Sequence, residues 1–301
     1  MANWETINAQ YIQEHGIEGR QRDLPDTGIP IQLVPGDIYE PNQFLRVTLA
    51  DGVTARLAWG RGALLAVIEM AAHSVGPEHV VTGDTYIFGD GGSATIAIDG
   101  NDSALTDGDL VYLTEGTRVA LRAGPSGFKA LEINSPVRVD LLRAAGIDVP
   151  AGVDGSFPDL SDRPPSLDAN RICPLADITV TPVGPPQAGG GPATLATASA
   201  RIIWGRHMML SFVMMAPHSH FPMHIHPEDQ LMMCMNGELI EGLAHHFPSM
   251  RGDKRNVILQ PGGMVHSAEL ADAGAECLDI FWPIRPDYLE HALKHQAHSG
   301  A

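Results

Sequence analysis

Short apolar runs separated by turn residues dominate the chain, and they predict strands rather than long helices. Residues 63–70 and 208–215 are apolar runs of strand length, each with a single polar residue. The pair Asn236-Gly237 lies between two further apolar segments and is a strong signal for a two-residue hairpin turn. Many short strands with turn residues every ten or so positions predict an all-β fold, either a closed barrel or a double-sheet jelly roll.

Helical patterning is confined to the edges of the strand-rich regions. It covers roughly residues 4–16, 138–146 and 286–297, so we expect only short flanking helices. The segment 183–192 is dominated by Gly and Pro and predicts an exposed loop that leads into or lies within the second half of the chain.

An internal repeat divides the chain. The segment 55–61, ARLAWGR, returns at 200–206 as ARIIWGR, and the segment 131–138 returns at 278–285. A repeat of this length in matching order indicates a duplicated structural unit. We therefore predict two tandem barrels, with domains at residues 1–150 and 151–301.

Charge and composition restrict the partners that the protein can have. The formal net charge of −17 argues against nucleic acid and against an anionic membrane surface, since both attract basic proteins. The 3 cysteines form no Cys-x-x-Cys pair, and the first twenty residues show no secretory signal. We expect a cytoplasmic protein with reduced, structural cysteines and a small-molecule substrate.

The second half carries the residues of a metal site. In a strand, residues i and i+2 share a face, so His224 and His226 can both point into a barrel. Gln230 follows closely, and His266 follows a Pro-Gly-Gly turn, so it would arrive from a neighbouring strand. Three imidazoles and one oxygen donor suit a divalent ion such as Fe, Ni, Co, Mn or Zn, with coordination positions left open for catalysis.

The first half lacks this set of ligands. His79 matches His224, but the repeat aligns the other three ligand positions with Val81, Thr85 and Ala120. We therefore expect one ion per chain, held by the second half alone. The first barrel is expected to serve packing, as one part of an intramolecular pseudo-dimer, and a further homodimer remains open.

The pattern HxHx3(E/Q)…PxGxxH formed by these residues resembles the two motifs of the cupin family, and the duplication resembles the bicupins. The resemblance implies two tandem jelly-roll barrels, of double-stranded β-helix type, with an ion in the mouth of the second. Leu270 stands where cupins often have Asn, and Gln230 stands in place of the usual Glu. Asp229 beside it is the alternative fourth ligand.

The segment that contains Asp279, Phe281 and Arg285 resembles the DxFxxxR segment of the small cupins that linearise unsaturated uronates from pectin and alginate. A Gln among the ligands is also similar to those cupins and to the bicupin isomerase of bacilysin biosynthesis. The resemblance implies that Asp279 and Arg285 are catalytic and that Phe281 lines the pocket. The alternative is a structural ion pair between Asp279 and Arg285.

Three functions follow as hypotheses. The leading one is a metal-dependent isomerase or lyase that moves a proton on a small carbonyl-containing carboxylic acid. In it Asp279 transfers the proton, Arg285 binds the substrate carboxylate, and His220, which the first half lacks, contributes to the substrate site. The second is an Fe(II)-dependent dioxygenase, and the third is a bicupin that binds small molecules without catalysis.

Overall fold

The computed structural model describes residues 4–17, 24–155, 163–184 and 197–299. Three α-helices lie in this part of the chain, close to the three helical segments expected from the sequence: α1 (Trp4–His15), α2 (Val139–Ala144) and α3 (Pro286–Ser299). None of the helices in the described ranges is both long enough and apolar enough to cross a membrane. Of the Gly- and Pro-rich segment 183–192, all but its first two residues lie outside the described ranges.

Two nine-stranded antiparallel sheets make up the rest of the fold. The first sheet consists of β2 (Leu45–Ala50), β3 (Val53–Trp59), β4 (Leu64–Met70), β5 (His79–Val80), β6 (Asp84–Ile98), β7 (Asn101–Thr106), β8 (Asp109–Leu113), β9 (Arg118–Ser135) and β10 (Ile172–Pro174). The second consists of β1 (Ile38–Tyr39), β11 (Val180–Pro182), β12 (Ala198–Trp204), β13 (Met209–Met215), β14 (His220–His224), β15 (Asp229–Gly242), β16 (Ser249–Arg251), β17 (Val257–Gln260) and β18 (His266–Trp282).

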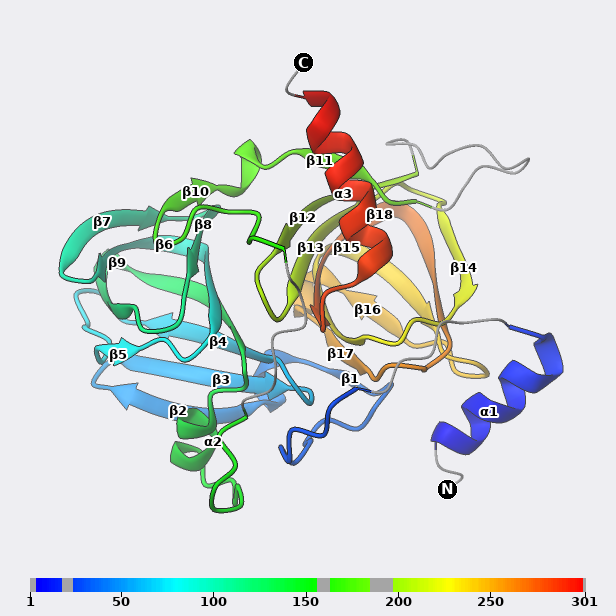
Figure 1. The fold of residues 1–301 in the computed structure, drawn as a ribbon, viewed down its shortest axis with the longest axis horizontal. Helices are drawn as coiled ribbons and strands as arrows, with labels where there is room; N and C mark the ends of the chain where they lie inside the picture. The colour runs from blue at the N-terminus through cyan, green and yellow to red at the C-terminus, as the bar shows by residue number, and fades with distance from the viewer. Residues whose placement is uncertain (1–3, 18–23, 156–162, 185–196, 300–301) are drawn as a thin grey trace.

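The two sheets have the same strand order, as the sequence repeat predicts. The first runs β8-β6-β9-β4-β3-β2 and the second runs β17-β15-β18-β13-β12-β11. Each sheet curls into a barrel, and the two barrels lie side by side (Figure 1). The predicted all-β fold of two tandem barrels is confirmed.

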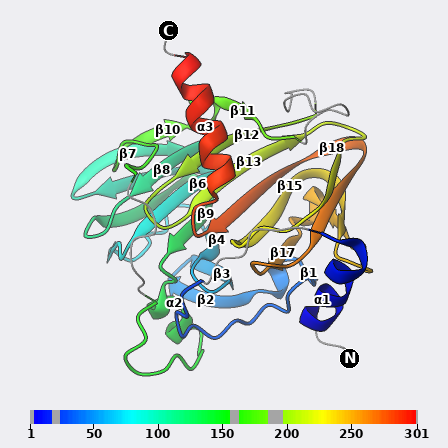
Figure 2. The same ribbon diagram turned by 45° about the vertical axis from the view of Figure 1, so that its right-hand side comes forward.

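One strand is exchanged between the two halves in each direction. β1 comes from the first half of the sequence but pairs with β17, whereas β10 comes from the second half but pairs with β8. Figure 2 shows β1 beside β17 at the base of the second barrel, close to α1. Each sheet therefore contains a strand from the other half of the repeat.

Alternation along the strands explains how the barrels join. On β15, Met232 and Cys234 face the core of the second barrel, whereas Leu231 and Met233 belong to a different buried cluster. That cluster, which we name the shared core, also contains residues of the first barrel such as Leu65. Since successive side chains of a strand point to opposite faces, each central strand contributes to two cores. The barrels are thus packed back to back through an apolar layer.

Gly62 tests how tightly the shared core is packed. A Cβ atom at this position would lie 1.9 Å from Cε2 of Trp282, which is 1% exposed. Because a buried ring cannot move without displacing its neighbours, we expect Gly62→Ala to lower the free energy of unfolding by about 3 kcal/mol. The measurement is urea denaturation followed by tryptophan fluorescence.

Gly76→Ala is the matched control, because its Cβ would meet its nearest neighbour at an ordinary 3.6 Å. This variant should unfold within about 0.5 kcal/mol of the wild type. Equal stability of the two variants would contradict close packing of Trp282 against the first barrel.

Candidate metal centre

Three histidines meet at the mouth of the second barrel. His224 ends β14, His266 begins β18, and the two stand directly opposite each other in the strand register. His226 lies in the loop that leads into β15. One ring nitrogen from each of the three lies within 4.8 Å of the others, so small side-chain shifts would let all three bind a single ion.

Backbone carbonyls fix the rings of two of these histidines. Nδ1 of His224 lies 2.9 Å from the Pro222 oxygen, and Nδ1 of His266 lies 2.9 Å from the Met264 oxygen. A carbonyl oxygen can only accept, so each Nδ1 carries the proton and donates it. In both neutral rings Nε2 therefore keeps the lone pair that a metal needs.

Burial also sets the charge of these rings. Loss of water lowers the pKa of His224 and lowers the pKa values of His226 and His266 well below the ordinary value. The Arg285 guanidinium and the neighbouring rings act in the same direction. The three imidazoles are therefore neutral at pH 7, which is the form that binds a metal. Their geometry and their charge both fit a divalent transition metal.

Gln230 and Asp229 are placed very differently with respect to the histidines. The Oε1 atom of Gln230 lies 3.1 Å from Nε2 of His226, within the histidine cluster. Asp229 instead accepts hydrogen bonds from the Arg61 side chain and from the backbone N–H of Gly262. This ion pair joins the two barrels, because Arg61 belongs to the first. Gln230 is the better placed of the two to be the fourth ligand.

The structure corrects one detail of the repeat alignment. His79 on β5 stands opposite Val119, as His224 stands opposite His266. The position in the first barrel that matches His266 is therefore Val119 rather than Ala120. The reason is that the extra residue of the second repeat lies between Gly262 and His266, just before β18 begins.

Asp279 and Arg285 do not form the ion pair considered as the structural alternative. Asp279 accepts a hydrogen bond of 2.9 Å from Nε2 of Gln230, and Arg285 binds both carboxylate oxygens of Asp287. In the first barrel the matching Arg138 binds Asp140 and also Glu132. Glu132 is one methylene longer than Asp279, so it reaches the arginine.

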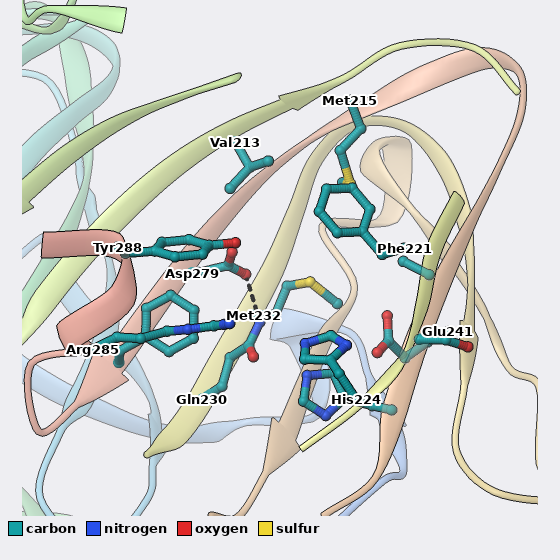
Figure 3. A pocket seen from close by; sticks show the side chains of 14 residues that line it. Val213, Met215, Phe221, His224, Gln230, Met232, Glu241, Asp279, Arg285 and Tyr288 are labelled. Atoms are coloured by element: carbon teal, nitrogen blue, oxygen red, sulfur yellow. Dashed lines mark hydrogen bonds between the residues drawn. The ribbon is translucent and has the colours of Figure 1, made fainter. Parts of the chain in front are cut away.

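Arg285 is held between two aromatic rings. Its guanidinium carbon lies 5.1 Å from the ring centre of Phe281 and 4.2 Å from that of Tyr288 on α3. Figure 3 shows the guanidinium pointing along the cavity toward Gln230, with Asp279 beside Tyr288. The stacking fixes the direction of the side chain and leaves an edge of the guanidinium facing the metal ligands.

Asp279 has the protonation behaviour of an acid–base group. It is 5% exposed, and burial raises its pKa from 3.8 to about 7, although the Gln230 amide and the Arg285 charge oppose the rise. A carboxyl group with this pKa can both hold and release a proton near neutral pH.

Of the two remaining predicted residues, Phe281 and His220, one lines the cavity and the other does not. Phe281 is fully buried and lines the cavity, as expected. His220 does not reach it, because its neighbour Phe221 faces inward. Its ring is exposed instead, with Nδ1 3.9 Å from Glu269.

Two buried carboxyl groups and a tyrosine belong to the site but escaped the motif-based reasoning. Glu228 lies 3.7 Å from Nδ1 of His226, and Glu241 lines the cavity opposite Gln230. Burial raises the pKa of Glu241 well above its usual range. Tyr288 covers Arg285, and burial raises its pKa to about 12. A position-by-position comparison of the repeats could have found the acids, since the first half has Gly83 and Ile96 there.

We expect one divalent ion per chain, bound by the second barrel alone. His226→Ala and His266→Ala should lose the ion, because each removes one of three converging lone pairs. His79→Ala should keep it. Elemental analysis of the purified proteins measures this, and two ions per chain or loss of metal in His79→Ala would contradict the assignment.

The buried Asp279 should make the metal-free protein less stable as the pH rises. Between pH 3.8 and about 7 the unfolded chain releases this proton while the folded chain retains it, so unfolding is increasingly favoured. Asp279→Asn cannot titrate and keeps an acceptor for Gln230. Its stability relative to wild type should rise by about 3 kcal/mol between pH 4.5 and 8, as measured by urea denaturation after chelation.

Asp287→Asn is the control of opposite sign. Its partner Arg285 keeps the pKa of Asp287 below the ordinary value, against the effect of burial, so the charged form stabilises the fold. This variant should lose stability relative to wild type as the pH rises through the acid range. The same pH trend in both variants would show that Asp279 is not specifically destabilised by burial.

Comparison with known proteins supports the fold. No family model matches the chain, and no curated protein matches it in sequence. Solved structures do. A cupin 2 conserved barrel domain protein from Leptotrichia buccalis has a TM-score of 0.57 and 12% identity, over 84% of this chain and 99% of that one. The S161A mutant of Bacillus subtilis oxalate decarboxylase has a TM-score of 0.57 and 14% identity, over 86% of this chain and 80% of that one. The chain has the fold of the cupin barrel proteins, and one of its two barrels carries a histidine triad suited to a metal ion.

Proposed function

We propose that the protein is a metal-dependent enzyme that transfers a proton on a small carbonyl-containing carboxylic acid, in an isomerase or lyase reaction. The observation that carries this proposal is the chain of contacts from His226 through Gln230 to Asp279, whose pKa is about 7. Through these contacts Asp279, a carboxyl group able to transfer a proton, lies next to the residues that would bind the ion.

The metal would be held by His224, His226, His266 and Gln230. An ion surrounded by four neutral ligands keeps its full 2+ charge and acts as a Lewis acid on a carbonyl oxygen. Bacillus subtilis oxalate decarboxylase, one of the similar structures, has Mn(II) centres, which supports a divalent ion in this fold.

Arg285 would bind the substrate carboxylate. Asp287 holds one edge of its guanidinium, while the other edge faces the cavity, so a carboxylate can form charge-assisted hydrogen bonds there. The protein carries a net charge of −17, and this local positive group is what makes the cavity suitable for an anion. Phe281 and Tyr288 keep the guanidinium in place.

Asp279 would move the proton. A substrate held between Arg285 and the metal ligands brings the carbon next to its carbonyl toward this carboxyl group. Asp279 takes the proton from one carbon and returns it to another, or to a leaving group. The neutral imidazoles cannot compete for the proton, because burial holds their pKa values low. The likeness to the DxFxxxR segment of the uronate cupins favours sugar-derived acids among the substrates.

Oxygen dependence separates the proposed proton transfer from a dioxygenase reaction. The metal-loaded protein, kept under nitrogen in deuterated water, is offered a panel of 2-oxo acids and unsaturated uronates. We expect deuterium on the carbon next to the carbonyl of at least one acid, detected by mass spectrometry, with more than one divalent metal. Gln230→Glu should keep the metal but slow this exchange, since a carboxylate ligand reduces the charge felt by the substrate.

The metal-loaded Asp279→Asn protein is the control for exchange that does not need the enzyme. Absence of exchange above this control with every acid would contradict the proposal. Activity that stops without oxygen and returns only with Fe(II) would show a dioxygenase instead.

The two polar residues should affect the kinetics differently. With the acid that is turned over, Asp279→Asn should lower kcat by about 10²- to 10⁴-fold, the usual loss for a general acid or base. Arg285→Lys keeps the charge but not the paired hydrogen bonds, so it should chiefly raise KM. Glu132→Gln and Arg138→Lys, the matching changes in the first barrel, should leave both constants unchanged. A fall of kcat alone in Arg285→Lys would contradict its role in binding.

A further inference from the structure

The first barrel contains a cavity of its own, larger than the one at the histidines. Its volume is about 290 Å³, and it occupies the place that corresponds to the metal site. The walls are the inward faces of β3, β4, β6 and β9, and α2 covers one end. Most of the lining is apolar, with Ala55, Ile68, Ile87 and Val119 among the residues that contribute.

This cavity is open to solvent on one side, and its walls are largely apolar. An apolar ligand that enters it removes wall surface from water, and the gain is roughly proportional to the apolar area covered. An apolar cavity of about 150 Å³ already admits benzene, so this one has room for a substituted aromatic ring. Val119, which stands opposite His79 where the second barrel has His266, is one of the apolar side chains that line the space.

One polar atom in this cavity has no partner. Nε2 of His79 is buried, and it has no hydrogen bond to any of the described residues. Nδ1 of the same ring lies 3.4 Å from the Pro77 oxygen, a long contact that is favourable when Nδ1 carries the proton. In the neutral ring Nε2 is then an acceptor that lacks a donor. An acceptor without a protein partner favours a ligand that brings a hydrogen-bond donor to it.

The positive charge in this cavity is already neutralised. The Arg138 side chain hydrogen-bonds to Glu132 and Asp140, whereas in the described part of the chain the matching Arg285 has one carboxylate partner, Asp287. Glu78 also lines the cavity. An anionic ligand would therefore find no free cation here and several carboxylates. The lining disfavours an anion, and its mostly apolar walls favour an uncharged ligand.

We propose that the first barrel is a binding site for a small, uncharged, largely apolar hydroxyl compound, such as a phenol, whose O–H donates to Nε2 of His79. The apolar walls bind the body of the molecule, and the histidine orients its one polar group. Binding at this site does not depend on the metal or on the reaction proposed for the second barrel.

The experiment compares two probes that differ by one hydroxyl group, 4-ethylphenol and ethylbenzene, by isothermal titration calorimetry on the full chain. We expect one molecule of 4-ethylphenol per chain, with ethylbenzene roughly 3- to 10-fold weaker because it leaves Nε2 unsatisfied. His79→Phe keeps a ring but removes the acceptor, so it should abolish the difference between the probes. Val119→Phe should weaken both probes more than tenfold by filling the cavity.

Location is established independently by methyl NMR with labelled isoleucines. Shifts should appear at Ile68 and Ile87, which line the cavity, and not at Ile258 and Ile280, which lie in the second barrel and the shared core. Ala144→Phe narrows the exposed rim on α2 and replaces Val119→Phe if that variant does not fold. His266→Ala should bind both probes as the wild type does.

Three outcomes would overturn the proposal. The first is no binding of either probe at millimolar concentration. The second is equal affinity for the two probes in the wild type, which would remove His79 as the recognition group. The third is loss of binding in His266→Ala but not in the cavity-filling variants, which would place the probe at the histidine triad.

Discussion

β15 and β18 run side by side through the second barrel, and the removal of water from between their side chains governs the chemistry of the site. The strand pair sets Gln230 opposite Phe281 and Met232 opposite Asp279, inside a wall of large apolar residues. The same loss of water keeps the histidines neutral and raises the pKa of Asp279 to about 7. In contact with water Asp279 would be fully ionised at pH 7, and the histidines would be partly protonated and would bind a metal less tightly.

The shared core makes this desolvation possible. Leu231 and Met233 on the outer face of β15 pack against the first barrel, so the strand is buried on both sides. A strand covered on both faces cannot shift its register without exposing apolar side chains, and the site therefore keeps its geometry. The ion pair between Arg61 and Asp229 crosses the same boundary. The first barrel thus contributes to the metal site without supplying a ligand.

The two barrels show how one fold can carry different chemistry. Both keep an arginine after the last long strand, with an aspartate two residues later as its partner. A single methylene separates Glu132, which closes onto its arginine, from Asp279, which stays with Gln230. The first barrel has no counterpart of His226, Gln230 or His266, and its one matching histidine, His79, lines a largely apolar cavity.

Sequence by itself determined the fold and the three histidines, because both rest on local patterns. Strand alternation and a repeat are legible without knowledge of what packs against what. The spacing of His224 and His226 and the turn before His266 likewise report on short stretches of chain. The hairpin turn expected at Asn236-Gly237 is wrong, because this pair forms an irregularity within β15 rather than its end. The expected place of His220 in the substrate site is wrong, because Phe221 is the inward-facing residue of that short strand. The motif does not show which of the two faces inward.

Only the tertiary structure decided the contacts between residues far apart in sequence. Asp229 and Gln230 are neighbours in the chain, and either could have been the fourth ligand. Arg61, more than a hundred residues away, binds Asp229 and leaves Gln230 for the site. The missing ion pair between Asp279 and Arg285, the exchanged strands β1 and β10, and the cavity around His79 are of the same kind. Each depends on which surfaces meet when the barrels close. The order of residue types along the chain does not show which distant residues will be in contact.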